Sequence, residues 1–311
     1  MRSASQAADL AASRSLLADL PLLAVAVVWG SSYLAVKQLT DAHTVLPMLV
    51  LRFTVVLPVF GVFAWRGLRT LGAAQWRGAA LLGVILGGIF LLESYGVVHT
   101  SATNAGLIIS LTMILTPLAE SLLSRTAIPR AFLGAAALSL LGVGLLTEGA
   151  GLQAPSFGDL LVLGAALTRT VHVLAMSRSR ALRGIDSLAL TWVQLAAAAV
   201  VFAIAAPFGG PAPWRVAAGW SLGQWSLLLY LSLFCTLFAF FVQMRAVRAT
   251  SPSRVSLLLG TEPLWAAVFG IALGGDRLGA PALLGGLLVL AGTEAGRRAV
   301  LPASGLVAEP A

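Results

Sequence analysis

Charged residues and cysteine are both scarce in this chain. Asp, Glu, Lys and Arg make up 10% of its 311 residues, whereas the hydrophobic set makes up 59%. About a quarter of the residues of a soluble domain are charged, so charges this sparse are too few to cover a water-facing surface. The single cysteine, Cys235, excludes an intrachain disulfide and a cysteine-based metal cluster. Its place in a hydrophobic run indicates a small packing residue.

Motifs for catalysis and for nucleotide binding are also missing. The sequence contains no His-Glu-x-x-His, no Gly-x-Ser-x-Gly and no Walker sequence, and no hydrophobic run carries a pair of carboxylates. An intramembrane enzyme would need a nucleophile with its base, or a set of metal ligands, inside the hydrophobic runs. We therefore expect no enzyme, no cofactor, no metal site and no direct use of ATP.

Long hydrophobic runs fill the chain instead. A helix of about 20 residues crosses the hydrocarbon core of a bilayer, which is about 30 Å thick. The sequence predicts an all-α integral membrane protein with ten transmembrane helices at residues 20–38, 45–65, 77–98, 102–123, 131–147, 159–177, 187–207, 225–244, 254–274 and 278–296. Residues 1–19 form an N-terminal segment without a cleaved signal, and residues 299–311 form a short tail.

Basic residues lie between these spans. The net charge of +8 would suit a nucleic-acid surface, but the 19 arginines recur in short connections and form no single patch. If the N-terminus is cytoplasmic, the inside segments hold 15 arginines and the outside connections hold only Arg215 and Arg277. This asymmetry is typical of the positive-inside rule. We expect a multi-pass protein of the cytoplasmic membrane, with both termini cytoplasmic and no nucleic-acid partner.

The two halves of the chain resemble each other. Paired features recur in order along both halves: Asp19-Leu20 and Asp159-Leu160, Arg52 and Gln194, Gln75-Trp76 and Gln224-Trp225, Thr116-Pro117 and Glu262-Pro263, Gly142 and Gly292. Each half has five spans, an odd number, so the second half enters the membrane from the opposite side. The sequence thus predicts an inverted repeat, residues 20–149 followed by residues 156–298. Such repeats are characteristic of secondary transporters.

Several short motifs resemble one known family. They are Trp29-Gly30-Ser31-Ser32-Tyr33, Leu51-Arg52-Phe53, Thr261-Glu262-Pro263-Leu264 and Gly275-Asp276-Arg277-Leu278. They resemble EamA-type members of the drug/metabolite transporter superfamily over roughly residues 20–297. The resemblance implies two inverted five-helix EamA repeats and export of amino acids or related metabolites, although some relatives import. Arg169 in the sixth span departs from the usual pattern.

Four ionisable residues lie deep in the spans. A charge at the centre of a span costs about 2.5–3.5 kcal/mol on insertion scales, so it is normally paired or faces water. Counted at ~1.5 Å per residue, Arg52 and Glu93 lie at comparable depths, and so do Arg169 and Glu262. Each pair is a candidate anchor for a zwitterionic or anionic substrate, or else a structural salt bridge.

A proton relay and a binding surface are further candidates. Glu93, His172 and Glu262 are predicted to exchange a proton, although a lone buried histidine more often bonds a neighbour. Trp29, Ser31, Ser32 and Tyr33 suit a substrate with an amino group or an apolar part, or else allow close helix packing.

Polar residues also mark the weak break between the third and fourth spans. We expect Tyr95, His99 and Asn104 to form a gate near the outer face or an interfacial loop. The glycine pair Gly83 and Gly87 indicates close helix packing. Pro117 and Pro263 are candidate kinks in the fourth and ninth spans.

These features favour a secondary transporter that exports a small metabolite by alternating access around a midplane site. Its partners would be a small-molecule substrate and the lipid bilayer, with the protein a monomer or a homodimer. An uptake permease for a sugar, an amine or another small solute stays open, as does a channel. Energy coupling, by protons or by the gradient of the metabolite itself, also stays open.

Overall fold

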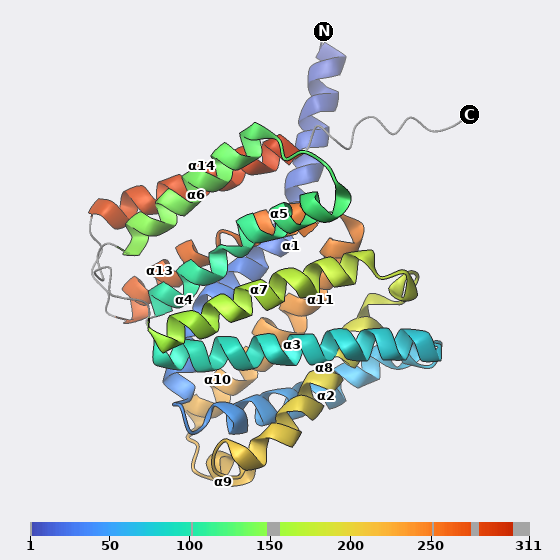
Figure 1. Cartoon of the computed structure of the whole chain (residues 1–311), viewed down its shortest axis with the longest axis vertical. Helices are drawn as coiled ribbons and strands as arrows, with labels where there is room; N and C mark the ends of the chain where they lie inside the picture. The colour runs from blue at the N-terminus through green and yellow to red at the C-terminus, as the bar shows by residue number, and fades with distance from the viewer. Residues whose placement is uncertain (1, 101, 148–155, 251, 275–279, 301–311) are drawn as a thin grey trace.

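The computed structural model describes residues 2–100, 102–147, 156–250, 252–274 and 280–300, and every regular element in these ranges is a helix (Figure 1). In chain order the elements are α1 Arg2–Leu39, α2 Val45–Leu68, α3 Ala73–His99, α4 Ala102–Ser110, α5 Thr112–Ser124, α6 Arg130–Thr147, α7 Phe157–Arg178, η2 Arg180–Leu182, α8 Ser187–Ala205, η3 Ala206–Phe208, α9 Pro213–Ala218, α10 Leu222–Ser232, η4 Leu233–Phe238, α11 Ala239–Ala249, α12 Pro252–Leu259, α13 Glu262–Gly274 and α14 Ala280–Val300.

Six helical segments are long and apolar enough to cross a bilayer. Among the described residues these are Asp19–Leu39, Val45–Leu68, Ala73–His99, Phe157–Arg178, Ser187–Phe208 and Leu222–Ala249. They contain the predicted first, second, third, sixth, seventh and eighth spans. The other four predicted spans correspond to shorter apolar helices, at Ile108–Ser124, Arg130–Gly142, Glu262–Leu273 and Leu287–Gly296. The chain is therefore a helical membrane protein that crosses the bilayer several times.

The predicted fourth and ninth spans, 102–123 and 254–274, are each built from two helices rather than one. The first break separates α4 from α5 at Leu111, and the second separates α12 from α13 just before Glu262. Pro263 has no backbone N–H, and it lies in the first turn of α13, where proline is tolerated. Pro117 instead lies within α5, beyond the break. Glu262 is thus placed at the start of a half-helix.

Helix contacts follow a similar plan in the two halves. α1 packs against α12 and α13, and α7 packs against α4 and α5. α6 and α14, at the ends of the two halves, lie side by side (Figure 1). A Cβ added at Gly142 would come within 2.6 Å of the Gly285 carbonyl oxygen, and one at Gly292 within 2.7 Å of that of Ala135. These two glycines therefore allow α6 and α14 to approach closely.

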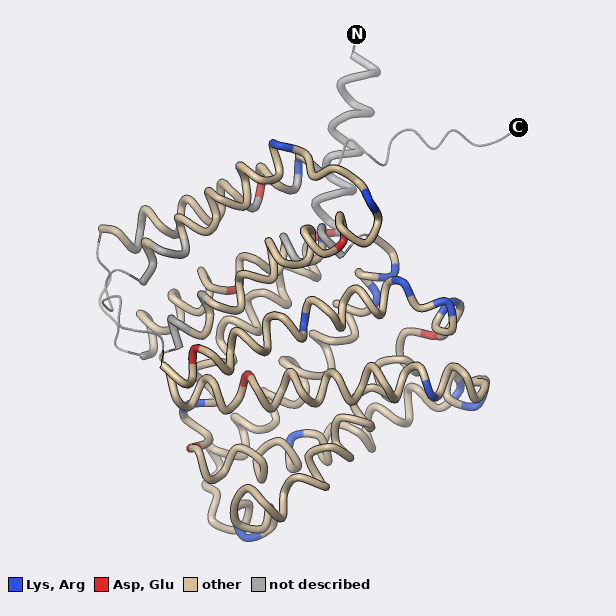
Figure 2. The backbone as a smooth tube through the Cα atoms, in the orientation of Figure 1, with Lys and Arg blue, Asp and Glu red and all other residues tan. Residues whose placement is uncertain are grey.

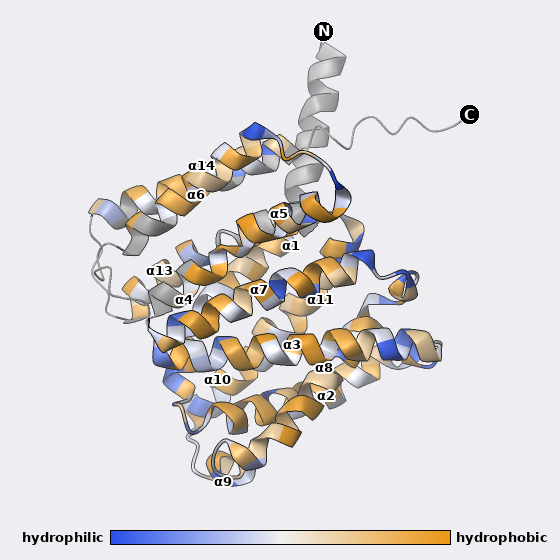
Figure 3. Ribbon diagram, in the orientation of Figure 1, coloured by the Kyte–Doolittle hydropathy of each residue, from blue (hydrophilic) through white to orange (hydrophobic). Residues whose placement is uncertain are grey.

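Hydrophobic side chains cover the outer faces of the helices as well as the core. Phe63, Leu122 and Leu287 are examples of large apolar residues that are more than half exposed. Figure 3 shows hydrophobic residues along the helices, and Figure 2 shows most basic residues gathered at the helix ends on one side. An apolar surface of this extent suits contact with lipid.

Two polar contacts involve the aspartates that open the first and sixth predicted spans. Asp19 on α1 accepts a hydrogen bond from Arg254 Nη2 on α12, at 2.7 Å. Asp159 on α7 accepts one from the hydroxyl of Thr100, just after α3, at 2.5 Å. Corresponding positions of the two halves therefore each contact a residue of the opposite half.

Candidate functional site

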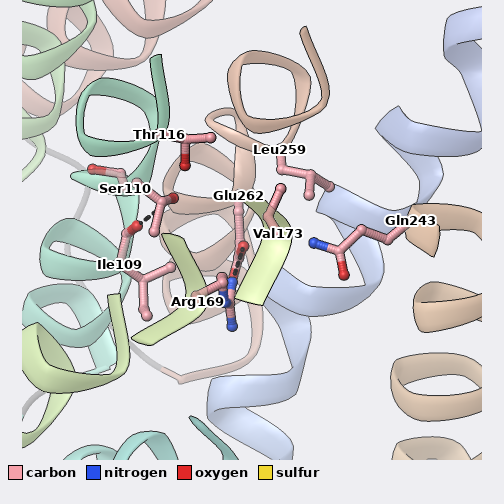
Figure 4. Close-up of a pocket in the computed structure, with 9 residues that line it drawn as sticks. Ile109, Ser110, Thr116, Arg169, Val173, Gln243, Leu259 and Glu262 are labelled. Carbon is pink, nitrogen blue, oxygen red and sulfur yellow. Dashed lines mark hydrogen bonds and ion pairs between the residues drawn. The ribbon is translucent and has the colours of Figure 1, made fainter. Parts of the chain in front are cut away.

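Two small cavities lie in the middle of the bundle and share Arg169. The Glu262 cavity, of about 10 Å³, is lined by Ile109, Ser110, Thr112, Thr116, Arg169, Val173, Gln243, Leu259 and Glu262 (Figure 4). The Glu93 cavity, of about 20 Å³, is lined by Trp29, Ser32, Tyr33, Val36, Arg52, Ile89, Phe90, Glu93, Ser94, Val97, Arg169, Cys235 and Phe240. Each has room for about one water molecule. Neither cavity, as it stands, has room for a molecule much larger than water.

Arg169 on α7 stands at the centre of a buried charge network. Its Nη2 lies 2.5 Å from Glu93 Oε2 on α3, and its Nη1 lies 3.6 Å from Glu262 Oε2 on α13. The guanidinium also lies over the ring of Trp29, 4.9 Å from its centroid. Glu262 accepts a further hydrogen bond from the Tyr33 hydroxyl. The predicted Arg169–Glu262 pair is confirmed, and the same cation also holds Glu93.

Arg52 has different neighbours from those the sequence predicts. The Arg52–Glu93 pair is wrong, because Glu93 binds Arg169 while Arg52 Nε donates to Thr236 Oγ1 at 2.6 Å. The Arg52 guanidinium lies over the Phe90 ring, 5.1 Å from its centroid. Among the described residues no carboxylate lies within 4.0 Å of this buried cation. Arg52 therefore faces the Glu93 cavity, which Glu93 also lines, without a carboxylate in direct contact among the described residues.

A π-helical segment, η4 at Leu233–Phe238, creates this arrangement. Its wider turn lets Thr236 Oγ1 donate to the Leu231 carbonyl, at 2.8 Å, while it accepts from Arg52. The same segment turns the Cys235 carbonyl toward Trp29, whose Nε1 donates to it at 2.9 Å. Segments of this kind are frequent at functional sites. The run of Ser232, Cys235 and Thr236 in an apolar span was a sequence signal for polar contacts here, beyond the packing role expected of Cys235.

Seven of the eight residues predicted to bind substrate line the two cavities. Trp29, Ser32, Tyr33, Arg52 and Glu93 line the Glu93 cavity, Glu262 lines the other, and Arg169 lines both. Ser31 is the exception: it lines neither cavity, and its hydroxyl lies 2.5 Å from that of Tyr230. A Cβ on Gly30 would lie 2.6 Å from Trp265 Cβ, so the first span combines cavity lining with close helix packing.

His172 belongs to a separate polar contact. Its Nε2 lies 2.7 Å from Gln194 Oε1 on α8, and the ring is buried. It lines neither central cavity, whereas the carboxylates with which it was grouped both contact Arg169. The structure thus places the histidine apart from the other two members of the predicted relay.

The three residues of the predicted gate have separate surroundings. The Tyr95 hydroxyl lies beside Gly209, where a Cβ would meet it at 3.2 Å. The exposed His99 ring packs edge-on against Phe157, with centroids 6.1 Å apart. Asn104 falls in α4, but its side chain lies outside the described residues.

Several lining residues were not predicted. Phe90 and Phe240 supply aromatic walls, and Gln243, Thr116 and Ser110 supply polar atoms near Glu262. The pairing of Thr116-Pro117 with Glu262-Pro263 was a usable signal for Thr116, whereas aromatic residues are too common in the spans to identify. Among the described residues, no three His, Cys, Asp or Glu side chains are grouped as a metal ion requires.

Comparisons with known proteins agree with this architecture. The chain matches the EamA-like transporter family over residues 16–147 and 156–293. Two proteins of Archaeoglobus fulgidus, each described as an uncharacterized transporter, are 25% and 26% identical to it over 281 residues. These alignments cover 89% and 86% of this chain, and 84% and 92% of the two relatives.

A solved crystal structure, described only as that of a protein, has a similar fold. It superposes with a TM-score of 0.72 at 18% identity, over 90% of this chain and 96% of the other. At this identity the likeness concerns the fold alone. The two family matches, in contrast, fall one in each half and together span most of the sequence. The chain therefore belongs to the EamA-like transporter family.

Proposed function

We propose that this protein is a secondary transporter that exports a small metabolite, an amino acid or a related compound, across the cytoplasmic membrane. It works by alternating access around the two central cavities. Its ten spans form two inverted five-helix repeats, and both termini are cytoplasmic. An uptake permease for a sugar, an amine or another small solute is the second candidate, and a channel is a third.

The repeated plan of the helices supports the inverted repeat. The fourth and ninth spans are both interrupted, at Leu111 and just before Glu262, and in each a helix of 9 or 8 residues is followed by one of 13. Interrupted helices of this kind surround the substrate sites of many transporters built from inverted repeats. The contacts of Asp19 and Asp159 also correspond. In alternating access these two contacts would break in turn, one in each conformation.

Arg52 is the observation that carries the proposal. It is buried, it faces a cavity and its only hydrogen bond to a described side chain goes to a neutral hydroxyl. A buried charge that no carboxylate contacts is costly, so binding an anionic group beside Arg52 would be favourable. Glu93 lies in the same cavity and offers a partner for an amine, if Arg169 keeps Glu262. A zwitterion would therefore match both ends of the cavity.

The experiment that tests this proposal is a thermal-stabilisation screen of the purified protein over amino acids, amines, sugars and nucleobases. We expect one carboxylate-bearing class to raise the melting temperature, and Arg52→Gln to abolish that shift. The matched control is Arg298→Gln, because Arg298 is an exposed arginine whose ion pair within the described part of the chain is the i,i+4 pair with Glu294. An unchanged shift in Arg52→Gln would overturn the anchor. Arg52→Gln protein that fails to fold would favour a purely structural role.

Proton coupling through Glu93 and Glu262 is part of the proposal, with His172 as a more remote member. Both carboxylates bind Arg169, so protonation of either one would weaken its hold on that cation. In vesicles that contain a pH-sensitive dye, substrate flux should change the internal pH stoichiometrically. Flux without a pH change would leave the metabolite gradient as the driving force.

A further inference from the structure

A third cavity, much larger than the central pair, lies at the arginine-rich ends of the helices. It has a volume of about 650 Å³ and is lined by Glu120, Ser124, Met176, Ser177, Arg178, Ser179, Leu182, Arg183, Gly184, Val247, Arg248 and Thr250. Pockets for small molecules usually measure about 300–1,000 Å³. Unlike the central cavities, this one has room for a metabolite as it stands. We call it the arginine vestibule.

The vestibule is aligned with the central site. Met176 follows Val173 by three residues on α7, and Val247 follows Gln243 by four on α11. Residues three or four apart lie on the same face of a helix, about one turn of 5.4 Å from each other. Val173 and Gln243 line the Glu262 cavity, whereas Met176 and Val247 line the vestibule. Residues that line the two spaces are therefore about one helical turn apart on both α7 and α11.

The charge of the vestibule wall is positive. Three guanidiniums, of Arg178, Arg183 and Arg248, face one carboxylate, that of Glu120. Serine and threonine hydroxyls make up much of the remaining polar lining. A concave surface lined by one sign of charge raises the local concentration of the opposite charge.

Two of these arginines are fixed by neutral oxygens. Arg178 Nη2 donates to Ser124 Oγ at 2.5 Å, and Arg248 Nη2 donates to the Ile185 carbonyl at 2.5 Å. Arg248 Nη1 also donates to Ser187 Oγ at 2.9 Å. These bonds hold the side chains at the wall without neutralising their charges, although the Asp186 carboxylate attracts the charge of Arg248.

We propose that the arginine vestibule is the entrance through which substrates bearing a carboxylate or phosphate group approach the central site. This inference rests on the proposed transport function, because the vestibule would collect the anionic group that Arg52 then binds. An anionic lipid headgroup has the same oxyanion chemistry. The proposal commits to a water-soluble anion, and the test separates the two sources.

The test is simple to design because the chain has a single native cysteine, Cys235, which can be replaced. In a Cys235→Ser background, Ser177→Cys puts one thiol on the vestibule wall, and Gly223→Cys puts a matched thiol at an exposed position on α10. Each protein, in phosphatidylcholine nanodiscs, is treated with an anionic and a cationic methanethiosulfonate reagent. We expect the ratio of anionic to cationic reaction rates to be roughly tenfold higher at Ser177→Cys. Adding Arg183→Gln, at an exposed position, should lower that ratio.

Equal ratios at the two thiols, or a ratio that Arg183→Gln leaves unchanged, would overturn the proposal. So would selective slowing of the anionic reagent at Ser177→Cys by added phosphatidylglycerol, which would assign the oxyanion site to a lipid headgroup. If phosphatidylglycerol leaves the ratio of anionic to cationic reaction rates at Ser177→Cys unchanged, the result supports a soluble anion. Loss of the charge preference while metabolites still stabilise the protein would reject the vestibule alone. A retained preference without any stabilising metabolite would reject the proposed function instead.

Discussion

Arg169 is the buried cation that the carboxylates of two other helices share. Glu93 comes from the first half of the chain, and Glu262 from the second, as Arg169 does. Tyr33, again from the first half, completes the contacts of Glu262. Breaking this network would therefore loosen the contact between the two halves at the centre of the bundle.

Replacement of Arg169 by glutamine should destabilise the protein strongly. It would leave the buried carboxylate of Glu262 and the partly buried carboxylate of Glu93 without their counter-ion, and loss of one partner of a buried ion pair typically costs about 3–5 kcal/mol. Thermal melting in detergent measures the effect, with Arg298→Gln as the exposed control. A triple variant that also carries Glu93→Gln and Glu262→Gln should regain part of the loss. Equal melting temperatures for Arg169→Gln and Arg298→Gln would show that the network does not stabilise the folded protein.

Depth along a helix predicted which residues meet only in part. Arg169 and Glu262 lie at comparable depths and do form an ion pair, as the sequence predicted. Arg52 and Glu93 also lie at comparable depths, but Arg52 binds Thr236 instead. Counting residues fixes the height of a side chain but not its direction around the helix, and several partners at one height compete for it.

At the scale of helices, the irregular segments position the site. The π-helical turn brings Thr236 to Arg52 and the Cys235 carbonyl to Trp29. The break before α13 places Glu262 opposite Tyr33 and Arg169. Hydrophobic length predicted where the spans lie but not these irregularities. Pro263 was a candidate kink, and the break of its span does lie just before it. The π turn has no distinctive composition, and the break at Leu111 lies six residues before Pro117, the candidate kink of its span.

Two glycines of α3 provide a matched test of helix packing. A Cβ at Gly83 would lie 2.5 Å from the Gln194 carbonyl oxygen on α8, whereas a Cβ at Gly88 would meet nothing within 4 Å. We expect Gly83→Ala to destabilise the protein by about 1–3 kcal/mol, because it forces α3 and α8 apart. Gly88→Ala should be neutral or stabilising by about 0.5–1 kcal/mol, because alanine favours the helix. Equal melting temperatures for the two variants would contradict this close α3–α8 contact.

At the scale of the whole molecule, composition and the placement of arginines were the most informative sequence features. They predicted a helical membrane protein, and Figure 2 shows the basic residues gathered on one side of the helices. The internal repeat predicted from paired motifs agrees with the two family matches. The arginine vestibule was not predicted, because its wall comes from distant segments, including residues 120–124, 176–184 and 247–250.

The central cavities are too small for a metabolite, and they are bounded by residues of both halves. If substrate passes through them as proposed, the helices of the two halves must move apart, which a fixed open channel would not need. Such movement would limit the rate to one conformational cycle per substrate, and flux would then saturate. It also predicts that substrate on one side accelerates the passage of substrate from the other.

Counterflow in reconstituted vesicles tests alternating access most directly. Vesicles are loaded with the compound that gives the largest stabilisation and are diluted into a trace of the same compound carrying a radioactive label. We predict that the label accumulates transiently inside and that its rate saturates with concentration, and that neither occurs with folded Arg52→Gln protein. Flux that rises linearly with concentration, without acceleration by the internal compound, would contradict alternating access around the central site.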